Sequence, residues 1–130
     1  MPATLKDMLD AAHAAVPKVG REEVEALVAE GALVVDVRDS AELVQGGKVA
    51  GARHVSRGML EFRADPESPL HDTEFRADRP VVVYCGAGGR AAMAGKTLKD
   101  MGFARVYNLG AFKDWVAAGG AVEHPMEQGM

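Results

Sequence analysis

Cys85 is the only cysteine in the chain, and its surroundings favour reactivity. It follows the apolar run 81–84 and opens a glycine-rich segment that leads directly into an alanine-rich helical pattern. A strand–turn–helix of this kind aims backbone N–H groups at one point, and the helix start adds positive potential. Both effects favour the thiolate, the reactive form of cysteine. We therefore predict a nucleophile at Cys85, held by the backbone of Gly86, Ala87, Gly88, Gly89 and Arg90.

The chemistry that suits such a thiolate is sulfur transfer. It can attack an electrophilic sulfur and hold it as a persulfide, whose terminal charge the amides stabilise. A thiophilic acceptor then removes the sulfur, which completes a double displacement. The alternative is that Cys85 is a small buried hydrophobe, the usual fate of a free cysteine. The glycines disfavour this alternative, because they cost backbone entropy that a core position does not require.

Cysteine phosphatases and arsenate reductases offer a second alternative, since they also join a cysteine and an arginine by a backbone loop. Their signature has five residues between the two, whereas four separate Cys85 from Arg90. The shorter loop suits one sulfur atom better than a tetrahedral oxyanion. A phosphatase would also need an aspartic acid to protonate the leaving group, and the sequence assigns none.

The elements that must position Cys85 alternate along the chain. We predict helices at 5–15, 21–30, 90–101 and 112–118, and a helical turn from 40. We predict strands at 33–37, 52–55, 81–84 and 104–109. A long polar segment at 58–79 separates the second of these strands from the third. This order predicts an α/β domain of three layers, in which helices flank a mostly parallel central sheet of about five strands. Ligands of such sheets bind beyond the carboxyl ends of the strands, where Cys85 lies.

Composition narrows the class of protein. The 130 residues fit one domain, and 48% hydrophobic with 26% charged residues is typical of a globular protein. The net charge of −4 gives no reason to expect nucleic acid as a partner. No segment approaches the roughly 20 apolar residues of a membrane span. A single cysteine suits a reducing compartment, so we expect a cytoplasmic protein that acts away from membranes.

Four segments together resemble the signatures of the rhodanese-like sulfurtransferase family, in the family's order. They are 35–39 with Glu42, 47–55, Cys85-x-x-Gly88-x-Arg90, and 102–115 with Trp115. The chain is similar to a single-domain rhodanese from about Val19 to Gly120. The resemblance implies a rhodanese-like domain at 19–122. The helical spacing before it predicts an N-terminal helical extension at 1–18, and we expect a flexible C-terminal tail at 123–130.

The resemblance also implies an activity. A sulfane sulfur would move from thiosulfate, mercaptopyruvate or a persulfide to cyanide, a thiol or an acceptor protein, through a Cys85 persulfide and without a cofactor. The histidines are not spaced as a metal site, so no metal is expected. Thiosulfate-specialised members often carry a cation at the positions of Gly86 or Ala87, and its absence here argues against thiosulfate as the physiological donor. A non-catalytic sulfur carrier or protein-binding module remains the alternative within the family.

Charged residues are expected to support the loop. Arg90 lies in the first helical turn, where a cation is unfavourable, so it should have a partner. That partner is either Asp36 or Glu42, which would brace the loop, or an anionic donor. Asp36 and Arg38 are expected to form an ion pair at the end of their strand. Arg57 follows a short strand and is the preferred arginine for substrate contact.

Overall fold

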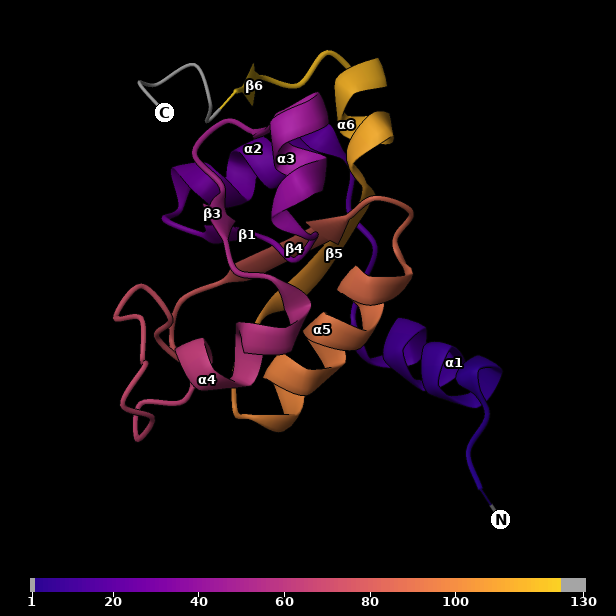
Figure 1. Ribbon diagram of the computed structural model, residues 1–130, viewed down its shortest axis with the longest axis vertical. Coiled ribbons are helices and arrows are strands. Elements are labelled where there is room, and N and C mark those ends of the chain that lie inside the picture. The colour runs from indigo at the N-terminus through magenta and orange to yellow at the C-terminus, as the bar shows by residue number, and fades with distance from the viewer. Residues whose placement is uncertain (1, 125–130) are drawn as a thin grey trace.

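The computed structural model describes residues 2–124. The helices are α1 (Leu5–Ala15), α2 (Arg21–Ala29), α3 (Ser40–Gly46), α4 (Leu60–Ala64), α5 (Gly89–Asp100) and α6 (Phe112–Ala117), with a 3-10 turn η1 (Arg57–Met59) before α4. The strands are β1 (Leu33–Asp36), β2 (Lys48–Val49), β3 (Arg53–His54), β4 (Val81–Cys85), β5 (Val106–Ala111) and β6 (Val122–Glu123). Helices α4 and α5 cover one face of the central sheet, with α1 beside α5, and α2 and α6 cover the other (Figure 1). The predicted three-layer α/β class is confirmed.

The central sheet has the order β3-β1-β4-β5, and all its neighbouring strands are parallel. Every residue of β1 and β4 is buried, as expected for strands covered on both faces. Four strands form this sheet within residues 2–124, against about five predicted. A single parallel bridge between Lys18 and Asn108 extends its β5 edge. The extension stays this short because Pro17 has no N–H with which to continue the pairing.

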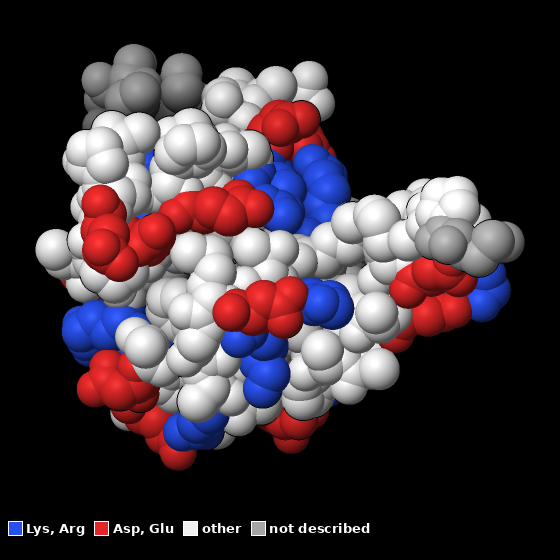
Figure 2. Space-filling view, turned by 90° about the horizontal axis from the view of Figure 1, so that it is seen from below, with Lys and Arg blue, Asp and Glu red and all other residues white. Residues whose placement is uncertain are grey.

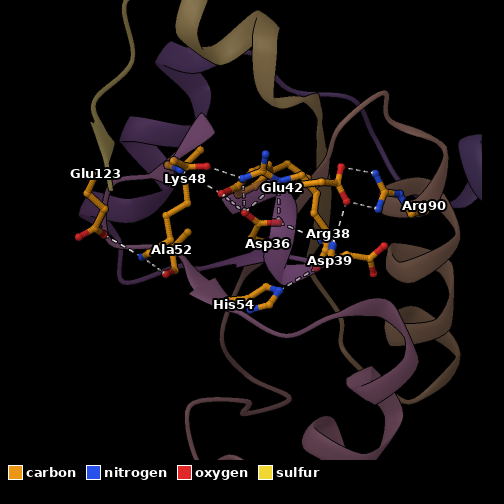
Figure 3. Close-up of polar contacts among 12 residues, drawn as sticks. Asp36, Arg38, Asp39, Glu42, Lys48, Ala52, His54, Arg90 and Glu123 are labelled. Carbon is orange, nitrogen blue, oxygen red and sulfur yellow. Dashed lines mark hydrogen bonds and ion pairs between the residues drawn. The ribbon is translucent and has the colours of Figure 1, made fainter. Parts of the chain in front are cut away.

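A small antiparallel ribbon of β2 and β6 lies apart from the sheet, and the sequence did not predict it. Lys48 Nζ pairs with Glu123 Oε1 at 2.8 Å across this ribbon and also donates to the Ala52 carbonyl (Figure 3). Glu123, the first residue of the predicted flexible tail, therefore belongs to a strand. Residues 125–130 of that tail lie outside the described part of the chain.

Helix α1 rests on α5 rather than standing free. Its buried Ala12 is 0% exposed, and the following Val16 joins the core beneath α5. Gly95 permits the close approach, because a Cβ placed there would lie 3.0 Å from both γ carbons of Val16. Thr4 and Asp7 form a capping box that begins α1. The N-terminal segment is thus packed against α5, the helix that begins within residues 86–90, the loop that follows Cys85 and is called the thiol loop below.

Acidic and basic side chains lie intermingled on the face seen from below in Figure 2. Among residues 2–124, no helix combines the length and the apolar character that crossing a bilayer requires.

Candidate active site

Cys85 is the last residue of β4 and lies at the carboxyl edge of the sheet, as predicted. It pairs in register with Ala111, the last residue of β5. The chain then turns through Gly88, which adopts φ +104° and precedes the first residue of α5. A left-handed φ is costly for any residue with a side chain. The glycine at 88 is therefore required by the turn that brings the helix start back over the thiol.

Two backbone amides point at the sulfur. Gly88 N lies 2.9 Å from Cys85 Sγ, and Ala91 N lies 3.4 Å from it. Ala91 was not among the predicted residues 86–90, although it is the third residue of α5, whose first N–H groups have no partner within the helix. Within the described chain, the other loop amides make no hydrogen bond to the thiol. The two N–H groups directed at the sulfur thus come from Gly88 and from the first turn of α5.

The thiol is less open than the sequence suggested. Cys85 is only 1% exposed, and Ala91 beside it is fully buried. The loop residues 86–90 are exposed or half-buried. A reactant must therefore approach the sulfur through the glycine-rich loop rather than across an open rim.

Arg90 and Glu42 form a two-point ion pair across the loop. Arg90 Nη1 donates to Glu42 Oε2 at 2.8 Å, and Nη2 donates to Oε1 at 3.0 Å, so α5 is tied to α3 (Figure 3). A Cβ at Gly86 would lie 3.1 Å from Arg90 Nη2 and 3.3 Å from Glu42 Oε1. The hydrogen bond from Arg90 lowers the pKa of Glu42 to about 2, and the same bond raises the pKa of Arg90. Of the two carboxylates considered, Glu42 is the partner that braces the loop.

The ion pair expected between Asp36 and Arg38 is present and buried. Arg38 Nη2 donates to Asp36 Oδ2 at 2.8 Å, and both side chains are at most 5% exposed. The same Nη2 donates to the Gly47 carbonyl at 2.7 Å, and the guanidinium carbon lies 4.5 Å from the centre of the Phe112 ring. Burial would lower the pKa of Arg38, but the hydrogen bond and charge of Asp36 outweigh it and raise that pKa. The pair fixes the turn that follows β1.

Tyr84 completes this cluster and was missed at the level of the sequence. Its hydroxyl donates to Asp36 Oδ2 at 2.7 Å and accepts from Val49 N at 2.9 Å. Burial raises the pKa of Tyr84, so its phenol stays protonated and available as a donor. Tyr84 directly precedes Cys85, and a tyrosine within an otherwise aliphatic strand was the one signal for a buried polar partner.

The hydrogen bonds of the Arg57 side chain go to residues outside the thiol loop. Its Nη2 donates to Thr97 Oγ1 at 3.1 Å and its Nη1 to Glu61 Oε1 at 2.9 Å. It lines a cavity of about 300 Å³ between α1 and α5, together with Met8 and Met93. Its predicted contact with substrate therefore remains a prediction. Among residues 2–124, no three histidine, cysteine or acidic side chains gather as metal ligands.

The sequence matches the family model of the rhodanese-like domain over residues 20–118. Thiosulfate sulfurtransferase GlpE of Ectopseudomonas mendocina is 31% identical over 103 residues, which cover 77% of this chain and 84% of that protein. The uncharacterized protein YqhL of Bacillus subtilis is 36% identical over 85 residues, or 65% of this chain. This chain matches only 60% of the length of YqhL.

Two solved structures share both the fold and substantial sequence. A Rhodopseudomonas palustris protein of unknown function, RPA3614, described as a "Possible Tyrosine Phosphatase", has a TM-score of 0.83 and 39% identity, covering 95% of this chain and 99% of that one. The polysulfide-sulfur transferase homodimer of Wolinella succinogenes has a TM-score of 0.73 and 34% identity, covering 91% and 85%. Both matches extend over nearly all of this chain, beyond the segment matched by the family.

Proposed function

The chain belongs to the rhodanese-like domain family, and on that premise we propose that it is a sulfurtransferase which carries sulfur as a persulfide on Cys85. The observation that carries the proposal is the sulfur of Cys85 with the Gly88 and Ala91 amides aimed at it. Amide donors stabilise negative charge on sulfur without supplying a proton. The relatives named as sulfurtransferases support the same reaction class.

In the first half-reaction the Cys85 thiolate attacks the outer sulfur of a donor such as thiosulfate. A bond forms between Sγ and that sulfur, while the bond between the two sulfurs of thiosulfate breaks and its electron pair leaves with sulfite. In the second half-reaction an acceptor thiolate or cyanide attacks the terminal sulfur of the persulfide. The electron pair of that S–S bond returns to Sγ, and the thiolate is restored. Charge and atoms balance in both steps, and no redox cofactor is required.

The residues of the thiol loop stabilise the persulfide intermediate in this proposal. The terminal persulfide sulfur lies about 2 Å beyond Sγ, toward the loop through which a reactant must approach. We assign the backbone of Gly86, Ala87, Gly88, Gly89 and Arg90 to this outer position, in addition to the Ala91 amide at Sγ. We assign Glu42 to bracing the loop through Arg90, and Asp36 with Arg38 to fixing the turn after β1.

A phosphatase is the second function to consider, because of the description given to the Rhodopseudomonas palustris protein. That chemistry needs a loop arginine to bind the phosphate oxygens. Here both terminal nitrogens of Arg90 are occupied by Glu42. We therefore expect no hydrolysis of p-nitrophenyl phosphate, and measurable Cys85-dependent hydrolysis would favour the phosphatase instead.

The proposal is tested by intact-mass analysis after incubation with thiosulfate, mercaptopyruvate or polysulfide. Wild-type protein should gain about 32 Da, the mass of one sulfur, and lose it again on addition of cyanide or a thiol. Cys85→Ser should gain nothing. Absence of loading from every donor would refute sulfur transfer. Loading that no small acceptor reverses would favour a sulfur carrier for a partner protein.

A thiolate that must stay reduced suits the reducing conditions of the cytoplasm. The partners we propose are therefore a small sulfur donor and a thiol or cyanide acceptor, with an acceptor protein as a further substrate, and neither nucleic acid nor membrane is required.

A further inference from the structure

Inorganic sulfur donors are anions, yet two arginines beside the thiol are already neutralised by carboxylates. Arg90 is paired at both terminal nitrogens with Glu42, and Arg38 is paired with Asp36. Neither Gly86 nor Ala87 supplies a charge. If the proposed sulfur transfer holds, an anionic donor needs attraction from a cation outside the loop.

Lys18 is placed to supply it. The backbone around it is fixed to the outer edge of β5, where Val19 N donates to the Asn108 carbonyl at 3.0 Å and Asn108 N donates to the Pro17 carbonyl at 2.8 Å. The Lys18 side chain extends to Gly110. A Cβ at that glycine would lie 2.5 Å from Lys18 Cε and 3.0 Å from Nζ. The space that a side chain at position 110 would occupy is therefore taken by the end of Lys18.

Gly110 in turn lies against the thiol loop. It is paired in register with Tyr84, and the next pair is Cys85 with Ala111. A Cβ at Gly88 would lie 3.6 Å from Gly110 Cα. With ordinary bond lengths, these contacts place the Lys18 ammonium within about 10 Å of Gly88 Cα. That is comparable to the Debye length of about 8 Å at physiological salt, so the charge acts on an ion entering the loop.

The ammonium of Lys18 has no competing partner within residues 2–124. It takes part in no hydrogen bond or ion pair there, and its side chain is exposed. Asp114 borders the same cavity of about 350 Å³ as Lys18, but the two do not form an ion pair. The positive charge is therefore available to a ligand.

We propose that Lys18 is a specificity-determining residue that draws anionic sulfur donors to the thiol loop. It acts at a distance and does not touch Cys85, so its charge favours entry of an anion rather than the chemistry of the thiolate. The cation that the loop itself lacks is supplied from the connection between α1 and α2.

The test compares two reagents that alkylate the same thiol and differ in charge, iodoacetate and iodoacetamide. Cys85 is the only cysteine, so every alkylation event reports on it. At about 0.01 M salt, where the Debye length is about 30 Å, the rate with iodoacetate should fall about three- to tenfold in Lys18→Gln, while the rate with iodoacetamide changes less than about twofold. The difference should disappear in about 0.5 M salt, which shortens the Debye length to about 4 Å.

Lys99→Gln is the matched control, because Lys99 is exposed, carries the same charge and lies in the last turn of α5, at the end of that helix away from the thiol loop. It should leave the ratio of the two rates unchanged. An equal loss in both variants, equal effects on both reagents, or a wild-type thiol that reacts with neither would overturn the role of Lys18. Failure of sulfur loading with a ratio that still depends on Lys18 would overturn the proposed reaction alone.

Discussion

The hydroxyl of Tyr84 donates a hydrogen bond to Asp36 Oδ2 over 2.7 Å, and it links the strand that carries the thiol to the strand beside it. The same hydroxyl accepts from Val49 N, so β2 is fastened to the pair. Asp36 is 0% exposed and also binds Arg38. This cluster lies one residue before Cys85 and on the face opposite α5, so it stiffens the strand end from which the thiol is presented.

Replacing Tyr84 with phenylalanine should therefore destabilise the fold. The buried Val49 N–H loses its acceptor and Asp36 loses a donor, which costs about 1–3 kcal/mol. Urea unfolding monitored by circular dichroism measures this loss. Tyr107→Phe is the control, because the Tyr107 hydroxyl accepts only from the exposed Arg105, and its cost should stay within about 0.5 kcal/mol. Equal costs for the two variants would contradict a special role for the Tyr84 hydroxyl.

The pair of Glu42 and Arg90 predicts a dependence of stability on pH. The pKa of Glu42 is lowered to about 2 from 4.5. A carboxyl with a lowered folded-state pKa contributes stability above its unfolded pKa and loses it as the pH falls toward the folded value. The advantage of wild type over Glu42→Gln should thus be constant from pH 7 to about pH 5 and shrink below it. Because Glu42 is 35% exposed, solvent screening limits the advantage to about 1 kcal/mol.

Chemical unfolding of both proteins across this pH range measures the difference. Glu25→Gln is the comparison variant, since Glu25 forms an exposed ion pair with Arg21 one helical turn away. Its effect should remain below about 0.5 kcal/mol. If the advantage of Glu42 is undiminished at pH 3, the ion pair does not stabilise the loop in the way proposed.

Patterns local in the sequence predicted most of the framework. The apolar runs at 33–37 and 81–84 correspond to β1 and β4, and the glycine-rich turn after Cys85 leads into α5 as expected. These features depend on neighbouring residues alone. The β2–β6 ribbon joins segments some seventy positions apart and only two residues long, so no periodicity reveals it.

The sequence likewise predicted the local features of the candidate site but not those that depend on tertiary packing. The cysteine, the loop and the choice of Glu42 or Asp36 as partner of Arg90 follow from residue type and spacing. Which carboxylate pairs with Arg90 depends on how α3 packs beside α5, and the place of Arg57 depends on its reach to Thr97. Burial of Cys85 to 1% exposure likewise results from tertiary packing.

Gly88→Ala should impair the reactivity of the thiol. There is room for the methyl group, since its nearest neighbour would lie 3.6 Å away, but φ is +104°. An L-residue held there costs about 1–3 kcal/mol, and relaxing the turn moves the Gly88 N–H off Sγ. Sulfur loading, followed by intact mass, should slow by about tenfold or more.

Gly31→Ala separates this effect from loss of stability. Gly31 has a similar φ of +100° with nothing within 4 Å of the added Cβ, and it lies between α2 and β1, at the end of the sheet opposite the thiol. It should destabilise the fold comparably and load sulfur at the wild-type rate. A comparable slowing in both variants would mean that stability, and not the aim of the Gly88 amide, limits loading.

The packing of the N-terminal segment on α5 can be tested at Gly95 and Val16. A Cβ at Gly95 would lie 3.0 Å from both γ carbons of Val16 and 3.4 Å from Val106 Cγ1. Gly95→Ala should therefore cost about 1 kcal/mol or more, although alanine in an isolated helix is favoured by about 1 kcal/mol. In a Val16→Ala background the crowding is relieved, so the same substitution should become neutral or stabilising. Urea unfolding of the four proteins gives the coupling energy. A coupling near zero would show that residues 5–16 do not pack on α5, whereas strong coupling makes the N-terminal segment part of the unit that holds the start of α5 over Cys85.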